Sequence, residues 1–139
     1  MTAKCLQSTL TDEQRRLIQA PERFRPSYQV TQGREYIVLG LSFVLRSSVY
    51  GYAPLFEICD DANRCISIPT LLFEVVDPRP SRFWLAKQPT NGGLLLWPEE
   101  FYVDFFHDDL SENAPEAREL FTKVLERLKK EFDVERAHE

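Results

Sequence analysis

The stretch Glu35-Tyr-Ile-Val-Leu-Gly-Leu-Ser-Phe-Val-Leu45 is rich in β-branched and aromatic residues. These residue types favour an extended backbone over a helix, because they pack well on the half-buried surface of a sheet. Gly40 lies in the middle of the stretch and is typical of a bulge or a bend. The stretch therefore predicts a β-strand with one local irregularity.

Further strand-like stretches follow it toward the C-terminus. Residues 49–59 and 65–68 flank the polar loop 60–64, which predicts a hairpin. Pro54 places the start of the first of these strands at a sheet edge or outside the ladder. Residues 71–76 also predict a strand, although the Leu71-Leu72 pair is compatible with a helical turn.

The clearest hairpin signal joins residues 82–87 to residues 94–97. The connection contains Asn91-Gly92, a pair that tolerates the positive φ angles of a tight reversal. This hairpin and the strands before it indicate a mainly antiparallel sheet.

Helix signals lie at the two ends of the chain. Thr11-Asp-Glu-Gln14 has the pattern of a capping box and predicts a short helix that ends near Ala20. A longer helix is predicted from Pro115 to about Val134, with residues 135–139 frayed. Apolar residues recur in it at spacings of three and four and form one stripe: Ala117, Leu120, Phe121, Val124, Leu125, Leu128 and Phe132.

Together these segments predict one α+β domain over residues 1–139. We expect a curved, mainly antiparallel sheet of about five or six strands, with the short N-terminal helix and the long C-terminal helix packed on it. The sequence contains neither a secretory signal pattern nor a long apolar run, which favours the cytoplasm and reduced thiols. Cys59 and Cys65 bracket the hairpin loop and are expected to face one another, most simply as small buried side chains.

The charge of the chain is unevenly distributed. Residues 88–117 contain no Lys or Arg, whereas seven of the 22 acidic residues of the chain lie there. The remaining 15 acidic residues are outnumbered by the 17 Lys and Arg, so this window is the source of the negative net charge of -5. Aromatic residues alternate with the acids between Trp97 and Glu112, and we refer to residues 97–112 as the acidic segment.

An acidic surface with aromatic anchors is suited to a basic partner, because charge accelerates encounter and buried aromatic rings supply much of the affinity. Phe101, Phe105 and Phe106 are left undecided between core and contact surface. The predicted contact residues are Trp97, Glu99, Glu100, Tyr102, Asp104, Asp108, Asp109 and Glu112.

The sequence gives weaker signals for a catalytic site or a metal site. His107 with Cys59 or Cys65 provides the residue types of a small hydrolase, but no local motif supports that geometry. Asp104, His107 and Asp108 have a spacing that places them on one helix face, as metal ligands would lie, although such a group is more often solvated surface. We therefore expect no catalytic residue, no cofactor and no bound metal.

Four stretches carry motifs that are structural rather than catalytic: Arg34-Glu-Tyr-Ile-Val-Leu-Gly-Leu-Ser-Phe43, Leu55-Phe-Glu-Ile-Cys-Asp-Asp61, Leu72-Phe-Glu-Val-Val-Asp77 and Ser81-Arg-Phe-Trp84. They resemble the small immunity proteins of bacterial polymorphic toxin systems, and the resemblance covers residues 22–110. It implies an inhibitor that binds a cognate toxin and occludes its active site or substrate channel.

Nucleic acid and a second copy of the chain are two other possible partners. The Lys and Arg residues are too scattered to form a nucleic-acid stripe, so direct nucleic-acid binding is disfavoured. A homodimeric regulatory module that pairs through an exposed strand edge remains an alternative to binding a different protein.

Overall fold

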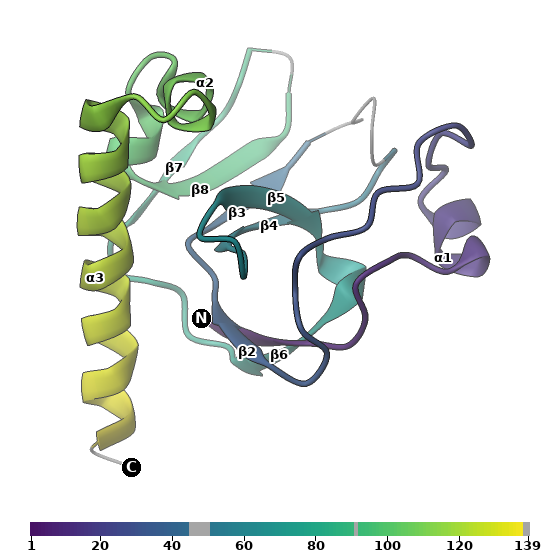
Figure 1. Ribbon diagram of the computed structural model, residues 1–139, viewed down its shortest axis with the longest axis horizontal. Coiled ribbons are helices and arrows are strands. Elements are labelled where there is room, and N and C mark those ends of the chain that lie inside the picture. The colour runs from purple at the N-terminus through teal and green to yellow at the C-terminus, as the bar shows by residue number, and fades with distance from the viewer. Residues whose placement is uncertain (45–50, 91, 138–139) are drawn as a thin grey trace.

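The computed structural model describes residues 1–44, 51–90 and 92–137, with side chains up to Phe132 (Figure 1). The described residues form two antiparallel sheets and three α-helices, which confirms the α+β class. The strands divide between a sheet of three and a sheet of five, where the sequence predicted one sheet of five or six.

The two sheets have simple antiparallel orders. In the three-stranded sheet, β1 (Thr2–Cys5) lies between β2 (Glu35–Ile37) and β6 (Phe73–Asp77). The five-stranded sheet has the order β5 (Cys65–Pro69), β4 (Leu55–Cys59), β3 (Gly40–Phe43), β8 (Leu94–Pro98) and β7 (Trp84–Lys87). Both predicted hairpins, β4–β5 and β7–β8, are confirmed by their registers. Residues 49–50 of the first predicted strand and Asn91 of the predicted turn lie outside the described residues.

Residues 35–43 cross from one sheet to the other, and this crossing was not predicted. Leu45, the last residue of the predicted strand, lies outside the described residues. Val38 and Leu39 link β2 to β3 and are both fully buried, in two different cores. Gly40 then starts β3 at a place where a Cβ atom would lie 2.8 Å from Cδ1 of Trp97. Close approach of the indole ring, rather than a bulge, accounts for this glycine.

The N-terminal strand β1 was also missed by the sequence analysis. It has only four residues, and its Ala and Lys are poor strand formers. Pairing on both sides, with β2 and with β6, offsets the low strand propensity of β1. Ala3 and Cys5 are fully buried in the core between the two sheets.

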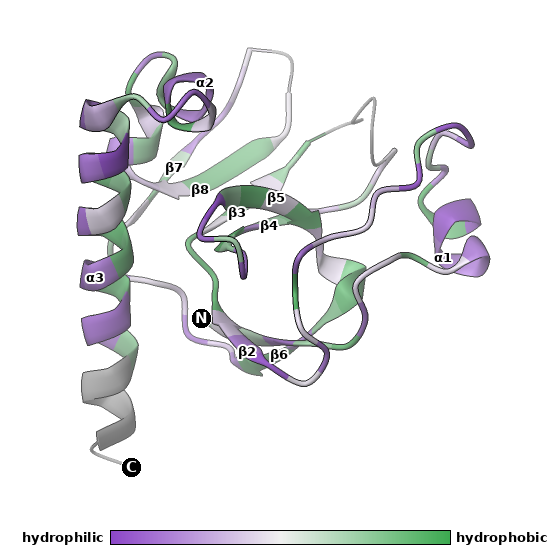
Figure 2. Ribbon diagram, viewed as in Figure 1, coloured by the Kyte–Doolittle hydropathy of each residue, from purple (hydrophilic) through white to green (hydrophobic). Residues whose placement is uncertain are grey.

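Two main cores lie on opposite faces of the five-stranded sheet. One fills the space toward the three-stranded sheet and includes Phe56, Ile58 and Ile68. The other lies beneath the C-terminal helices and is built around Phe101, Phe121, Val124 and Leu128, with members of the predicted helical stripe. Figure 2 shows β5 and β8 as mainly hydrophobic, whereas α1 and α2 are mainly hydrophilic.

The capping box at the first helix is confirmed. In α1 (Asp12–Leu17) the backbone N–H of Gln14 donates to Oγ1 of Thr11 at 3.1 Å, and Oε1 of Gln14 accepts from the Thr11 N–H at 2.9 Å. The helix ends before the predicted Ala20, because Gln19 adopts a left-handed backbone with φ of 56°.

The remaining helices lie close to the strands that follow or precede them in sequence. The 3-10 turn η1 (Thr70–Leu72) confirms the alternative of a helical turn at Leu71-Leu72. The turn η2 (Glu99–Tyr102) and helix α2 (Phe106–Ser111) follow β8 directly. Helix α3 (Pro115–Ala137) extends three residues beyond the predicted end, and residues 138–139 lie outside the described residues.

Helix α3 is tied to the sheet near its C-terminal end. The buried Glu131 carboxylate accepts from Oγ of Ser81 at 2.7 Å and from the Arg82 N–H at 2.9 Å. Because both contacts bridge about fifty residues of sequence, they fix the helix against the segment that precedes β7. No helix in the described part of the chain combines the length and apolar character that a membrane crossing needs.

Candidate functional sites

The acidic segment contributes an exposed rim beside β8. Five of its carboxylates and one phenylalanine are exposed to solvent, and we call these six residues the acidic surface: Glu99, Asp104, Phe105, Asp108, Asp109 and Glu112. They lie on η2, on α2 and on the short segments beside them. All five carboxylates were predicted as contact residues.

Phe105 is the apolar centre of the acidic surface. Its side chain is 74% exposed, and its backbone φ of 64° is left-handed. A bulky residue with positive φ is uncommon and costs about 1–2 kcal/mol. The Phe105 carbonyl accepts from the Asp109 N–H at 2.8 Å, so this conformation begins α2 and leaves the ring in solvent. Val103 nearby is 52% exposed.

The two neighbouring phenylalanines point the other way. Phe101 and Phe106 are only 1% and 2% exposed and stack with their ring centroids 5.0 Å apart. They pack in the core that covers the sheet beneath α3. The three undecided aromatics thus separate into two core residues and one surface residue.

Trp97 and Tyr102, predicted as contact residues, are held within the fold. The Trp97 indole N–H donates to Oγ of Ser42 at 3.0 Å, and its ring stacks on that of Tyr102 at 5.2 Å. The Tyr102 hydroxyl donates to the carbonyl of Leu85 at 2.6 Å. Both side chains are half-buried, so only part of each is open to a partner.

Glu100, another predicted contact residue, is paired inside the protein. Its two carboxylate oxygens accept from the Arg127 guanidinium at 3.0 and 2.6 Å. This paired hydrogen bond lowers the pKa of Glu100. Glu100 therefore fixes η2 against α3, and its charge is compensated by Arg127.

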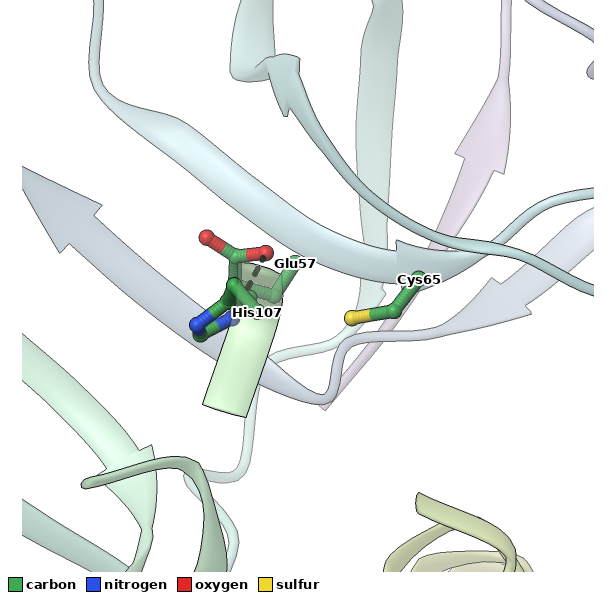
Figure 3. Close-up of side chains that lie close together, drawn as sticks. All are labelled: Glu57, Cys65 and His107. Atoms are coloured by element: carbon green, nitrogen blue, oxygen red, sulfur yellow. Dashed lines mark ion pairs between the residues drawn. The ribbon is translucent and has the colours of Figure 1, made fainter. Parts of the chain in front are cut away.

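A second group of functional side chains lies beneath α2 and was not predicted as a set. Within the described part of the chain, Glu57, Cys65 and His107 bring a carboxylate oxygen, a sulfur and a ring nitrogen within 4.8 Å of one another. Figure 3 shows the Cys65 sulfur pointing toward the other two side chains, and we call these three residues the Glu57 cluster. Asp104 and Asp108, which the sequence grouped with His107, are not part of it.

Glu57 is a carboxylate buried in the middle of the sheet, with only 2% of the residue exposed. One oxygen, Oε1, accepts from Oγ of Ser67 at 2.6 Å and from Oγ of Ser42 at 3.4 Å. The other, Oε2, is buried and has no hydrogen-bond partner among the described residues. Burial raises the pKa of Glu57 from 4.5 to about 7, against the opposing effect of the two hydroxyls.

His107 covers Glu57 from α2. Its Nε2 lies 3.9 Å from Oε2 of Glu57, too far for a hydrogen bond, and is likewise buried without a partner in the described chain. Aromatic rings of Trp97, Phe101 and Phe106 surround the imidazole at 4.9–5.5 Å. Burial lowers the pKa of His107, which favours the neutral ring, and the negative charge of Asp108 opposes that effect.

Cys65 completes the cluster, and Cys59 stands opposite it in the β4–β5 register. Both thiols are free, and burial raises the pKa of each. A raised thiol pKa is the opposite of what an activated nucleophile requires. The Cys59 sulfur instead lies 3.4 Å from Oδ1 of Asn63. The sequence-based alternative of a hydrolase using Cys59 or His107 stays a prediction.

A cavity of about 610 Å³ opens beside the Glu57 cluster. Cys65 and His107 line it, whereas Glu57 lies behind them. The cavity wall also carries Arg64 and Arg118, and both have an anionic or carbonyl partner: Asp60 for the first and the Asn63 carbonyl for the second. The cluster is therefore reached from a polar cavity.

Glu57 gave little signal in the sequence. Side chains alternate between the two faces of a strand, so Glu57 lies on the other face of β4 from Phe56 and Ile58. Because those two residues face the core between the sheets, the sequence places Glu57 toward solvent. The structure covers that second face with α2 and α3, which turns an ordinary strand glutamate into a buried one. A single polar residue in a strand cannot reveal this without the packing of distant helices.

Comparison of the chain with protein-family models, curated proteins and solved structures gave no match.

Proposed function

We propose that this chain is a protein-binding inhibitor that contacts a basic protein partner through the acidic surface. In line with the resemblance to immunity proteins, we propose that the partner is a cognate toxin. The observation that carries the proposal is the exposed ring of Phe105, held outward among the five exposed carboxylates of the acidic surface. This proposal concerns binding and needs no chemistry from the chain.

Phe105 is the residue from which a partner complex would gain most. An exposed aromatic ring gains little in the free protein, and its left-handed backbone is unfavourable. Burying such a ring in a partner's pocket would remove apolar surface from water and contribute about 2 kcal/mol, as aromatic hot spots do. The exposed Val103 lies beside it and would enlarge the same apolar patch.

The surrounding charges determine which partner fits. Asp104, Asp108 and Asp109 are exposed on either side of Phe105, and the whole window 88–117 lacks Lys and Arg. Like charges on a partner would be repelled, whereas a basic cleft would be attracted and oriented during encounter. A toxin that acts on nucleic acid presents such a cleft, which the carboxylates would fill in place of phosphates.

The test uses the protein encoded by the reading frame immediately upstream of the gene for this chain. Both proteins are purified separately, and the affinity and association rate are measured by titration calorimetry and by surface plasmon resonance. We expect a 1:1 complex, a weakening of at least about tenfold for Phe105→Ser, and a slower, less salt-dependent association for D108K/D109K. Inhibition of the partner should be lost in parallel.

The chain offers matched controls on α1 and in the segment that follows it. Leu17 is 73% exposed, so Leu17→Ser removes a comparably exposed apolar side chain, and E13K/E22K reverses two exposed charges away from the acidic segment. These variants should bind as the wild type does. A complex that tolerates Phe105→Ser and D108K/D109K would contradict the proposed surface. Self-association of the chain alone in size-exclusion chromatography, without a partner complex, would favour the homodimer alternative.

A further inference from the structure

We propose that Glu57, Cys65 and His107 form a binding site for a divalent transition-metal ion, with Zn²⁺ as the preferred occupant. The proposal is independent of the acidic surface, because it depends on the buried side of α2 and on strands β4 and β5. It adds a metal site to a chain whose sequence predicted none.

The donor set is the first argument. Zn²⁺ in proteins is held by thiolate sulfur, imidazole nitrogen and carboxylate oxygen, and each member of the Glu57 cluster supplies one of these. Harder ions such as Mg²⁺ and Ca²⁺ prefer a shell of oxygens, which this set does not offer. The combination of ligands therefore selects zinc or a metal of similar softness.

The spacing is the second argument. Ligand atoms that lie 2.0–2.3 Å from a tetrahedral zinc ion are separated from one another by about 3.3–3.8 Å. Oε2 of Glu57 and Nε2 of His107 lie 3.9 Å apart, close to that separation and too far apart to bond directly. All three ligand atoms lie within 4.8 Å of one another, so a shift of about 1 Å would complete the geometry.

The lack of any hydrogen-bond partner for the two facing atoms, among the described residues, is the third argument. Oε2 of Glu57 and Nε2 of His107 are both buried and form no hydrogen bond within the described chain. A buried polar atom without a partner costs about 1–3 kcal/mol, and a buried charge costs more. A cation between them would satisfy both atoms and compensate the Glu57 carboxylate.

The surroundings would hold the ligands in place. Oγ of Ser67 donates to the second carboxylate oxygen of Glu57 at 2.6 Å, which orients the carboxylate as outer-shell hydrogen bonds do in zinc sites. Aromatic rings of Trp97 and Phe106 pack against His107 and limit its rotation. Three protein ligands leave one tetrahedral position, and the cavity lined by Cys65 and His107 is the route by which a water molecule would reach it.

The test uses the full chain after removal of metals with a chelator, titrated with Co²⁺ and then with Zn²⁺. Co²⁺ reports a thiolate ligand by a charge-transfer absorption band in the near ultraviolet. We expect one Co²⁺ per chain, the thiolate band, and displacement of Co²⁺ by one equivalent of Zn²⁺. Cys65→Ser should remove the band, and Glu57→Gln and His107→Ala should each lower the affinity for Co²⁺ at least about tenfold.

Matched controls distinguish this site from adventitious binding. Cys59→Ser removes the thiol opposite Cys65, and His138→Ala removes the one other histidine of the sequence. Both should keep the band and the affinity. Near-ultraviolet circular dichroism of each metal-free variant checks folding, and Cys65→Ser and Glu57→Gln are conservative enough in size to keep it. The proposal is overturned by wild-type protein that takes up no stoichiometric Co²⁺, or by a band that survives Cys65→Ser or disappears with Cys59→Ser.

Discussion

Helix α2 presents two faces that differ in almost every physical respect. The outer face carries Asp108 and Asp109 beside Phe105, all in solvent. The inner face carries Phe106 and Leu110 in the core, with His107 over the buried Glu57. Six residues of helix thus separate the acidic surface from the Glu57 cluster. Adjacent residues of one acidic segment therefore have opposite environments, and only the fold reveals which residue has which.

Truncation of the two adjacent phenylalanines should give the largest difference in stability between the two faces of α2. Phe106 is 2% exposed and Phe105 is 74% exposed. Phe106→Ala should lower the free energy of unfolding by about 3–5 kcal/mol, because it removes a buried ring and leaves a cavity. Phe105→Ala should change it by less than about 0.5 kcal/mol. Urea denaturation of both variants measures the difference.

Equal destabilisation by the two substitutions would show that the two faces of α2 are not separated as described. Phe101→Ala provides the positive control, because Phe101 stacks on Phe106 and is equally buried. It should destabilise the protein by a similar amount. A smaller effect for Phe101→Ala than for Phe105→Ala would also contradict the division of the aromatics.

The outer face could be predicted from sequence because its signal is local. The carboxylates of the acidic segment are contiguous, and a window without Lys or Arg is visible without a fold. The helix stripe and the two hairpins were predictable for the same reason, since their periodicities and turn residues lie within a few positions. Orientation was not predictable: a Phe105-Phe106 pair contains no sequence signal for which ring is buried.

The inner face could not be predicted because its members meet only through tertiary packing. Glu57, Cys65 and His107 come from β4, β5 and α2, and His107 is separated from Glu57 by fifty residues of sequence. The sequence paired His107 with its neighbours Asp104 and Asp108, which lie outside the cluster. The crossing between sheets at Val38-Leu39 was missed for a similar reason, because two buried apolar residues look alike whichever core they enter.

The buried Glu57 carboxylate also makes the stability of the protein depend on pH. Burial raises the pKa of Glu57 to about 7 in the folded protein, above its ordinary value of 4.5. The protonated carboxyl therefore stabilises the fold relative to the ionised one, fully below pH 4.5, and this stabilisation is lost as the pH rises through 7. The metal-free protein should lose up to about 3 kcal/mol of stability from this group over that range.

Glu57→Gln isolates this effect, because glutamine does not titrate. The stability of the wild type minus that of the variant, both measured in chelator between pH 4.5 and 7.5, should fall with pH. Subtracting the variant removes the contribution of His107, which faces Glu57 and is present in both proteins. The lowered pKa of His107 makes stability rise with pH, opposite to the effect of Glu57. Cys65, also in the cluster, has a raised pKa and does not titrate in this range. A flat difference would contradict the burial of a titrating carboxyl at this position.

Asp77 is the natural counterpart, a carboxylate that is also largely buried but has a cation as partner. Arg79 donates to both of its oxygens, and these hydrogen bonds lower the pKa of Asp77 from 3.8 to about 2. Its contribution is present above pH 3.8 and is lost as the pH falls toward 2, the reverse of Glu57. Arg79 is 43% exposed, so solvent reduces the effect to about 1 kcal/mol. Comparison of Asp77→Asn with the wild type in acid checks it.

The smallest expected effect bears most directly on the outer face. Glycine accepts the φ of 64° at position 105 without the steric cost that phenylalanine carries, about 1–2 kcal/mol, but it loses more conformational entropy on folding. Phe105→Gly should therefore raise the free energy of unfolding by about 0.5 kcal/mol, measured by urea denaturation beside Phe105→Ala. If the same substitution weakens the partner complex, the ring reduces the stability of the free protein and contributes to binding, as a contact residue does. A loss of stability with Phe105→Gly would instead mean that the exposed ring supports the fold, and the proposed anchor would have to be sought among other residues of the acidic surface.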